Sequence, residues 1–452
     1  MTARLLPLAK GRMQDIMAWR QGQPVTLAHF LADAAQLASA LPAGRHVLNA
    51  CSDRYRFAVG FAAALLAGKI SLLPPALTPE MVRQVHVFAP DAFCLADQTI
   101  NMALPLFSWA DLMASAPRVA VDEVPAMGAL QTAAITFTSG STGAPVAHRK
   151  SWGSVVQSTC AEAARLGLLD GRNHSIVATV PPQHMYGLES TVLLALQSGA
   201  TMSAAHPFYP ADICAELAAT PRPRMLVTTP AHLKVLLASG LEVPPPDSVL
   251  SATAPMPPQL AALAEERLSA PLFEIYGSTE TGQIASRRTT ESAEWTLFPG
   301  VRLTAVAGRV YASGGHVGEP MVMADELELL DEEHFLLHGR TADLVNIAGK
   351  RSSIGYLNHQ LNAIAGVTDG AFFMPDDSAH DGVTRLMAFV VAPGLDAAQL
   401  LAALRQRIDA IFLPRPLVLL DSLPRNTTGK LTRATLETLV QAHQQKGLVH
   451  GG

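Results

Sequence analysis

Short apolar runs alternate, in the first part of the chain, with segments whose apolar residues recur at helical spacing. Residues 47–51 and 70–73 are apolar runs of strand length, and two prolines end the second run. Residues 27–41 and 56–66 carry apolar side chains at helical spacing. A strand, a helix and a strand joined by short links are typical of a βαβ unit. The pattern therefore predicts a parallel sheet near the start of the chain.

The same alternation continues through the middle of the chain. An amphipathic helix is predicted at residues 152–166. Further strands are predicted at residues 175–180, 225–229, 249–252 and 272–276, and further helices at 231–238 and 259–268, with an alanine- and leucine-rich helix that ends at Leu196. Strands that alternate with helices again indicate parallel sheets covered by helices.

The last part of the chain has a different pattern. Residues 301–310 and 326–337 are predicted strands of a smaller β-rich piece, and the polar segment 339–343 interrupts the pattern. We therefore predict an α/β fold with two domains. A large N-terminal domain, residues 1–339, contains several subdomains with mainly parallel sheets and the β-rich piece. A small, mobile α+β domain, residues 340–452, follows it.

Composition limits the class of protein. The chain has 452 residues, of which 49% are apolar and 16% charged, and this balance supports a large core and argues against disorder. The net charge of -5 argues against a nucleic-acid-binding protein. Four scattered cysteines without a C-x-x-C pair, no apolar segment typical of a signal peptide and no run long enough to span a membrane indicate a cytoplasmic protein with reduced thiols.

A run of small side chains follows the predicted strand at residues 133–137. It contains Thr138, Ser139, Gly140, Ser141, Thr142 and Gly143. Glycine allows the backbone to approach a ligand closely, and the hydroxyls add short donors, so this composition suits a polyphosphate. The spacing is not that of a Walker loop. The alternative is a flexible surface turn, which has the same composition.

Four separated motifs together resemble one family. They occur in the order TSGSTGAP (138–145), YGSTE (276–280), Gly339-Arg340 followed by 349–351, and PRNTTGK (424–430). This set is similar to the acyl-adenylate-forming superfamily, which includes acyl- and aryl-CoA synthetases, peptide-synthetase adenylation domains and luciferases. The resemblance covers about residues 45–435.

The resemblance implies an AMP-forming acid–thiol ligase. A carboxylate attacks the α-phosphate of ATP and expels pyrophosphate, and a thiol then attacks the acyl-adenylate and displaces AMP. The reacting oxygens of the first step are anionic, so the enzyme must mainly position them and neutralise their charge. The implied cofactors are ATP, Mg²⁺ and the phosphopantetheine thiol of an acyl carrier protein or of coenzyme A. The carboxylic acid is a small molecule.

The resemblance also assigns the residues that bind the nucleotide. They are the six residues Thr138 to Gly143 for the β- and γ-phosphates, Thr279 for the α-phosphate, Tyr276 for adenine, Asp325 for the ribose hydroxyls, and Arg340 and Arg351 at the domain junction. Asp325 has an adjacent competitor, Glu326, and the usual Thr-Gly before the acid is replaced by Met-Ala.

Four residues receive catalytic roles from the same resemblance. Thr279 and Glu280 act at the phosphates, Glu280 as the magnesium ligand, because a carboxylate is the hard oxygen donor that this ion prefers. Lys430 bridges carboxylate and phosphate during adenylation. His184 is the gate beside the acyl tunnel. The alternatives are an ordinary surface lysine at 430 and a loop histidine at 184.

The chain departs from the family pattern at two places. The phosphate loop normally continues Pro-Lys-Gly, but Val146 replaces the lysine, which leaves His148, Arg149 or Lys150 to supply the lost positive charge. Ala342 replaces the usual charged residue two positions after the junction arginine.

The acid and the thiol are predicted from a narrower likeness. Residues 53–57, 144–150 and 347–351 are similar to small ligases of aryl-polyene and xanthomonadin-type pigment pathways. Those enzymes load an aromatic acid, of the 4-hydroxybenzoate or 4-hydroxycinnamate type, onto an acyl carrier protein. Two alternatives stay open: a fatty acyl- or aryl-CoA synthetase that uses free coenzyme A, and a nucleotide-binding relative that has lost turnover.

Overall fold

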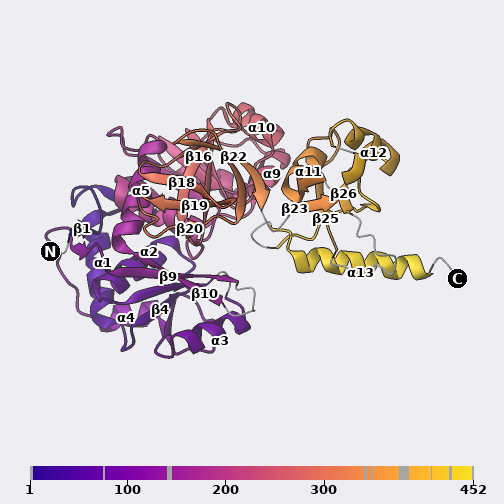
Figure 1. Ribbon diagram of the computed structural model, residues 1–452. Helices are drawn as coiled ribbons and strands as arrows, with labels where there is room; N and C mark the ends of the chain where they lie inside the picture. The colour runs from indigo at the N-terminus through magenta and orange to yellow at the C-terminus, as the bar shows by residue number, and fades with distance from the viewer. Residues whose placement is uncertain are drawn as a thin grey trace. The chain divides into compact units, whose positions relative to one another are not determined.

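The structure is a computed structural model that describes residues 4–74, 77–139, 145–340, 344–347, 350–375, 386–408, 410–426 and 430–449 (Figure 1). Its packing divides the chain into two compact units. Unit 1 contains Met1–Met256, Ala261–Ala307 and Tyr311–Met321, and unit 2 contains Pro257–Leu260, Gly308–Val310 and Val322–Gly452. The predicted domain boundary after residue 339 marks the point about which the small C-terminal domain is expected to rotate during catalysis. Static packing does not test a pivot, so that division stays a prediction.

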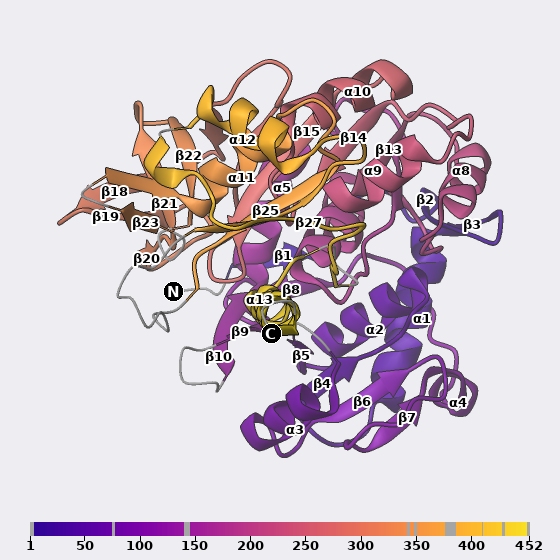
Figure 2. The same cartoon turned by 90° about the vertical axis from the view of Figure 1, so that its right-hand side faces the viewer.

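One sheet of unit 1 contains the βαβ unit predicted near the start of the chain. Its strand order is β10 (Pro145–Ser151), β9 (Thr132–Ser139), β5 (Ile70–Leu73), β4 (His46–Asn49), β6 (Phe93–Ala96) and β7 (Leu106–Ser108). β10 is antiparallel to β9, and the other neighbours are parallel. Figure 2 shows β4, β6 and β7 side by side. Helix α2 (Arg54–Leu66) connects β4 to β5 and is buried on almost every side, which explains its alanine-rich sequence.

A second sheet contains the strands predicted for the middle of the chain. In unit 1 its order is β3 (Gln23–Thr26), β2 (Ile16–Arg20), β12 (Thr201–Ser203), β11 (Ser175–Ala178), β13 (Arg224–Thr228), β14 (Ser248–Ser251), β15 (Leu272–Ser278), β16 (Gly282–Arg287) and β17 (Trp295–Leu297). The strands from β2 to β15 in this order are parallel, and β3, β16 and β17 are antiparallel additions. The mainly parallel sheets of the prediction are therefore present.

Helix starts follow from short polar side chains at the ends of strands. Asp53 accepts a hydrogen bond from the Arg56 amide at the start of α2, and Ser151 caps α5 (Trp152–Arg165) in the same way. Ser151 is also the last residue of β10. The strand after the run of small residues from Thr138 to Gly143, called the Ser/Gly/Thr segment below, therefore leads directly into α5. The remaining described helices that begin before residue 300 are α1 (Leu27–Ala40), α3 (Pro79–Phe88), α4 (Trp109–Ser115), α6 (Met185–Gly187), the π-helix η1 (Leu188–Leu193), α7 (Leu194–Ser198), α8 (Pro210–Ala219), α9 (Pro230–Ala238) and α10 (Pro258–Leu268).

Two apolar runs that the sequence pattern treats as single strands are hairpins. The predicted run 301–310 contains the turn between β18 (Val301–Val306) and β19 (Arg309–Gly314), where Ala307 and Gly308 have positive φ angles. The predicted run 326–337 is likewise split into β21 (Asp325–Leu329) and β22 (His334–Arg340). A tight turn interrupts the alternation of side chains by only two to four residues, so the hydrophobic pattern did not reveal it. The other short strands outside the C-terminal sheets are β1 (Leu5–Pro7), β8 (Ala126–Gly128) and β20 (Met321–Val322).

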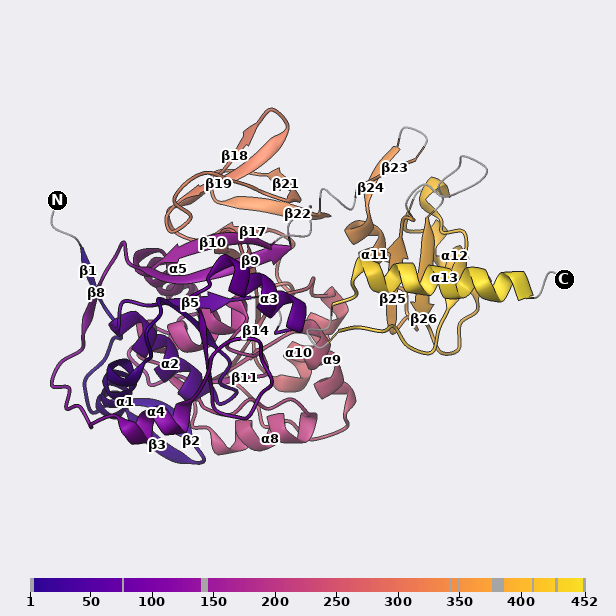
Figure 3. The same ribbon diagram turned by 90° about the horizontal axis from the view of Figure 1, so that it is seen from below.

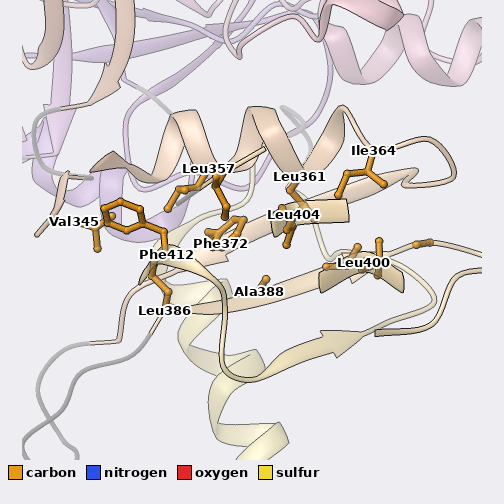
Figure 4. Packing of buried hydrophobic residues seen from close by; sticks show 13 residues of the cluster. Val345, Leu357, Leu361, Ile364, Phe372, Leu386, Ala388, Leu400, Leu404 and Phe412 are labelled. Carbon is orange, nitrogen blue, oxygen red and sulfur yellow. The ribbon is translucent and has the colours of Figure 1, made fainter. Parts of the chain in front are cut away.

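Unit 2 contains a small α+β arrangement with two apolar cores. Strand β26 (Met387–Val391) lies between β25 (Asp369–Phe373), which is antiparallel, and β27 (Leu417–Leu419), which is parallel. One core packs beneath α11 (Ile354–Asn362) and α12 (Ala397–Arg405), as Figure 4 shows. The other packs beneath α13 (Arg433–Val449), which Figure 3 shows along β25 and β26. The unit also holds the hairpin β23 (Leu344–Ile347) and β24 (Lys350–Ser353) and the 3-10 helix η3 (Ala410–Phe412).

No helix in the described parts of the chain is long and apolar enough to cross a membrane. This finding agrees with the expectation from the sequence.

A buried arginine joins the two sheets of unit 1. Arg54, the first residue of α2, is fully buried, and its guanidinium donates hydrogen bonds to the carbonyls of Ala178 and Val180 and to the hydroxyl of Thr191 at 2.9–3.2 Å. Burial lowers the pKa of Arg54 to about 10, which still keeps the side chain charged at neutral pH. The arginine therefore fixes the end of β11 and the π-helix η1 against α2.

We predict that Arg54→Met lowers the free energy of unfolding by about 1–3 kcal/mol, because buried oxygen acceptors lose their donors. Urea denaturation measures this change. The control is Arg118→Met, at an exposed position, which should change the free energy of unfolding by less than about 0.5 kcal/mol. Equal effects of the two substitutions would show that the guanidinium contacts carry no net stability.

Candidate active site

Strands β9 and β10 are the two strands of a hairpin, and in the sequence they flank the Ser/Gly/Thr segment. Ser139 pairs with Pro145 and Thr138 with Val146, so the strands approach each other directly below this segment. The Thr138 hydroxyl lies 2.9 Å from the His148 Nε2 atom on the opposite strand. The remaining predicted phosphate-loop residues, Gly140, Ser141, Thr142 and Gly143, lie outside the described residues, and their assignment stays a prediction.

A second turn presents Thr279 and Glu280. Strand β15 ends at Ser278 and β16 begins at Gly282, so the two predicted site residues occupy the connection between antiparallel strands. The Ser278 and Thr281 hydroxyls lie 3.1 Å apart, and each accepts a hydrogen bond from the other residue's amide. These bonds close the turn around Thr279 and Glu280.

The close approach of the two strands requires glycine. A Cβ atom at Gly277 would overlap the carbonyl oxygen of Gly282, so no other residue fits there without a shift of the backbone. Gly282 itself has φ +76°, a conformation that side chains with a Cβ adopt rarely. Both glycines of the YGSTETG segment therefore have structural roles.

Side chains from the first hairpin hold the backbone of the second. The Lys150 Nζ atom donates a hydrogen bond to the Glu280 carbonyl at 2.6 Å. The Thr136 hydroxyl lies 3.5 Å from the Thr279 carbonyl, at the outer limit for a hydrogen bond. The β9–β10 hairpin and the β15–β16 turn are thus neighbours within unit 1. The turn that carries YGSTE therefore lies beside the strands that flank the predicted phosphate loop.

Lys150, one of the three residues predicted to supply the charge of the missing loop lysine, already has a partner. Its ammonium group contacts the Glu280 backbone, and His148 contacts Thr138. Arg149 is exposed. Lys150 and His148, two of the three candidates for the missing charge, therefore already have hydrogen-bond partners within the site.

The predicted adenine and gate residues lie close to strand ends. Tyr276 on β15 is buried, and its ring centroid is 5.5 Å from that of Trp295. His184 is half-buried and immediately precedes α6. The Tyr186 hydroxyl donates to the carbonyls of Thr228 and Leu250, both at 3.1 Å, at the carboxyl ends of β13 and β14. In open α/β sheets, ligands bind outside the carboxyl ends of the strands, so His184 lies at the edge where a substrate is expected.

The remaining predicted residues belong to unit 2. Asp325 and Arg340 are direct partners in the register of β21 and β22. Arg351 lies on β24 opposite Asn346. Lys430 is exposed, and its amide donates to the Asn426 side chain at 2.8 Å. The side chains of Arg340 and Arg351 are outside the description, so their roles stay predictions, as do those of Asp325 and Lys430.

A buried polar network behind the turn escaped the sequence analysis. Ser158 donates to Glu189 at 3.4 Å. With the Gln283 amide oriented to satisfy both neighbours, its nitrogen lies 3.2 Å from Glu162 and its oxygen accepts from Ser190 at 2.9 Å. Burial raises the pKa of Glu162 to about 8 and that of Glu189 to about 7. The signal in the sequence was the position of Glu162, which lies on the buried face of α5 with Val155 and its apolar neighbours.

His316 lies beside this network. Neither of its ring nitrogens has a hydrogen-bond partner within the described structure, although the side chain is buried. Burial lowers the pKa of His316 to about 4, so its ring is neutral at physiological pH. A Cβ atom placed on Gly282 would lie 3.9 Å from His316 Nε2 and 3.2 Å from Glu189 Oε1. Both side chains therefore lie close to the start of β16.

Comparison with known proteins identifies the family of the chain. The chain matches the family described as AMP-binding enzyme over residues 9–356. A 4-coumarate–CoA ligase of Halorhodospira halophila is 30% identical over 310 residues, which cover 66% of this chain and 75% of the relative. A 3-hydroxybenzoate–CoA/4-hydroxybenzoate–CoA ligase of Thauera aromatica is 23% identical over 360 residues, which cover 68% and 66%.

Solved structures share the fold at low sequence identity. ATP-bound MatB from Rhodopseudomonas palustris aligns with a TM-score of 0.80 and 20% identity over 94% of this chain and 96% of its own. The o-succinylbenzoate CoA synthetase MenE from Bacillus subtilis, in complex with its acyl-adenylate intermediate, aligns with a TM-score of 0.80 and 19% identity over 94% and 95%. The predicted fold class is therefore confirmed: it is that of the adenylate-forming enzymes, with a large N-terminal and a small C-terminal domain.

The fold and the site thus define an enzyme of the acyl-adenylate-forming superfamily, as the four motifs predicted. More specifically, the chain belongs to the AMP-binding enzyme family. At this level the prediction of an AMP-forming acid–thiol ligase is supported by relatives that are CoA ligases.

The raised pKa of Glu162 gives a pH prediction. Between its ordinary value of 4.5 and about 8, folded Glu162 keeps a proton that the unfolded chain releases, so its contribution to stability falls as pH rises through this window. Glu162→Gln removes this titration. The melting temperature of the variant relative to the wild type should therefore be higher at about pH 9 than at about pH 5.

The control for this measurement is Glu266→Gln, at an exposed position on α10, which should leave the pH profile of the melting temperature unchanged. A difference between Glu162→Gln and the wild type that is the same at both pH values would contradict the prediction.

Proposed function

We propose that the protein activates an aromatic carboxylic acid with ATP to an acyl-adenylate and transfers the acyl group to a phosphopantetheine thiol of an acyl carrier protein. The observation that carries the adenylation half is the contact between the β9–β10 hairpin and the Thr279–Glu280 turn, made by Lys150 at 2.6 Å. The contact supports this half because Lys150 belongs to the strand that follows the predicted phosphate segment and Glu280 is the predicted magnesium ligand. The aromatic acid is supported by the names of the relatives, which act on 4-coumarate, indoleacetate, hydroxybenzoate and 2-succinylbenzoate.

The first half-reaction forms the mixed anhydride. A carboxylate oxygen attacks the α-phosphorus, the bond to the β-phosphate oxygen breaks, and pyrophosphate leaves. Thr279 binds the α-phosphate by its hydroxyl, and the residues from Thr138 onward bind the β- and γ-phosphates. Lys430 neutralises charge between carboxylate and phosphate, which is the main requirement when two anions must meet.

The residues of the turn fit a magnesium ion held mainly through phosphates. Glu280 would supply a carboxylate, which is a hard oxygen donor, and Mg²⁺ in phosphoryl-transfer sites needs only one or two carboxylates besides the substrate phosphates. When bound, the ion offsets the negative charge of the phosphates. Asp325 and Tyr276 hold the ribose and adenine, with Arg340 and Arg351 at the domain junction.

The second half-reaction needs a different neighbour at the acyl carbon. The thiol sulfur attacks the carbonyl carbon, and AMP leaves with the anhydride oxygen. Lys430 must withdraw before a thiol on a long arm can reach the adenylate. We propose that residues 340–452 turn about the segment near Arg340, with the carboxyl-terminal domain as a lid. Domain closure of this kind is a common way to sequence two steps in one site.

The second candidate uses free coenzyme A as the thiol. The observation that favours it is that the relatives at 30% and 31% identity are both 4-coumarate–CoA ligases. The carrier protein is supported by the likeness of residues 53–57, 144–150 and 347–351 to ligases of aryl-polyene and xanthomonadin-type pathways. A fatty acid as substrate and a relative without turnover remain the two other readings.

Acid-dependent exchange of labelled pyrophosphate into ATP tests the adenylation half directly. We expect exchange with 4-hydroxybenzoate and 4-hydroxycinnamate, much less with medium-chain fatty acids, and none without Mg²⁺. Exchange that is fastest with fatty acids would show that the substrate is a fatty acid and not an aromatic acid. Absence of exchange with every acid, from folded protein, would indicate a relative without turnover.

The thiol is tested separately, with the acid that exchange selects. A phosphopantetheine-loaded acyl carrier protein and free coenzyme A are each supplied at saturating concentration, and thioester is measured by mass. Carrier-protein thioester at the higher kcat/KM supports the proposal. Preference for free coenzyme A would establish the second candidate.

Lys430→Ala should slow adenylation by about 100-fold or more, as expected when a group that stabilises transition-state charge is lost. Transfer from chemically prepared acyl-adenylate to the thiol should stay close to the wild-type rate. The control is Lys234→Ala, an exposed lysine of unit 1, which should leave both steps unchanged. Adenylation at the wild-type rate in Lys430→Ala would show that the catalytic role is assigned to the wrong residue.

A further inference from the structure

Lys150 is a lysine in an unusual place. It lies on β10, immediately before the residue that caps α5, and only 7% of it is exposed. Lysine is rarely buried to this extent without a partner, because removing an ammonium group from water is costly. Here the described partner is a main-chain oxygen, the carbonyl of Glu280, at 2.6 Å.

Two carboxylates interact electrostatically with this buried lysine. Burial lowers the pKa of Lys150, and the carboxylates of Glu189 and then Glu280 oppose that shift. Glu189 is itself 3% exposed, and the positive charge of Lys150 counteracts the rise of its pKa that burial causes. Glu189 on η1 and Lys150 on β10 are thus opposite charges buried in the same part of unit 1, with Glu280 beside them.

The Glu280 peptide is fixed by this arrangement from one side. The turn that contains Glu280 is closed by the bonds between Ser278 and Thr281, and the Lys150 bond fixes the carbonyl between them. A carbonyl held by a charged donor at this distance cannot rotate without losing a strong, charge-assisted bond. The direction in which the Glu280 side chain leaves the backbone is therefore set from the β9–β10 hairpin.

We propose that Lys150 is the positioning residue for the magnesium ligand Glu280. Lys150 acts through the Glu280 carbonyl and touches neither substrate nor metal. It also couples the phosphate segment to the metal ligand, because it lies on the strand that follows that segment. The inference rests on the proposed function, since it concerns how the metal of the adenylation step is held.

The test is Lys150→Met, which keeps the length and apolar stem of the side chain but removes the donor. Its effect is measured on two reactions: pyrophosphate exchange as a function of Mg²⁺ concentration, and transfer from prepared acyl-adenylate to the thiol. The Mg²⁺ concentration for half-maximal exchange should rise by about tenfold or more, as is typical when the partner of a metal ligand is removed. The KM for the acid and the rate of thiol transfer should stay near wild-type values.

Lys69→Met is the matched control. Lys69 is also a partly buried lysine of unit 1 whose Nζ atom donates to backbone carbonyls, those of Pro42 and Gly44, but these belong to the loop before β4. It should lower stability without changing the Mg²⁺ dependence. A general weakening of unit 1 would move both variants alike, and a positioning role moves only Lys150→Met.

The double variant Lys150→Met, Glu189→Gln protects the test against misfolding. It removes the buried carboxylate that interacts electrostatically with Lys150, and it should show the same rise in the Mg²⁺ requirement. Unchanged Mg²⁺ dependence in whichever variant folds, or equal losses in adenylation and thiol transfer, would overturn the inference. Exchange that is absent in the wild-type protein would instead overturn the proposed function, so the two failures are distinguishable.

Discussion

The site depends on the backbone of one turn being held by the side chains of a neighbouring hairpin. Lys150 donates to the Glu280 carbonyl, and Thr136 lies against the Thr279 carbonyl. Neither side chain belongs to the motif that it supports. These two contacts fix the strands that flank the predicted phosphate segment relative to the turn that carries the predicted magnesium ligand.

Elsewhere in unit 1, buried polar side chains also hold main-chain oxygens of other segments. Arg54 joins α2 of the first sheet to the end of β11 and to η1 of the second, so the two sheets of unit 1 are connected by a fully buried, hydrogen-bonded charge. Tyr186 joins the ends of β13 and β14. Buried polar groups need partners, and here the partners are main-chain oxygens at strand ends. Arg54 and Tyr186 therefore cross-link the edge at which a substrate is expected.

The sequence predicted the elements well where the hydrophobic pattern was long and continuous. The βαβ unit around α2 and the parallel strands β11, β13, β14 and β15 follow from apolar runs, and the runs of β5, β11, β13 and β15 end directly before proline or glycine. The hairpins at 301–314 and 325–340 were taken as single strands, because a short turn hardly disturbs the alternation of side chains. The register that sets Asp325 opposite Arg340 is a tertiary result that no local pattern contains.

Motifs in the sequence located some of the site residues, and the contacts in the structure added their neighbours. Thr279 and Glu280 could be located from YGSTE alone, whereas the contact of Lys150 with the Glu280 carbonyl is a tertiary result that the motif does not contain. Glu162, Glu189 and His316 were missed because none of them belongs to a recognised motif. Their importance lies in partners from other segments, such as Gln283 and Ser158. Sequence spacing within one helix can place such a residue on a buried face but cannot name what it meets there.

The central claim is that the β9–β10 hairpin and the β15–β16 turn form a single site for ATP with Mg²⁺. Hydrogen–deuterium exchange, with and without a non-hydrolysable ATP analogue and Mg²⁺, tests it most directly. The account predicts that peptides covering residues 132–151 and 276–287 gain protection together and over the same range of nucleotide concentration. Protection of one peptide without the other, or of neither at saturating nucleotide, would contradict it.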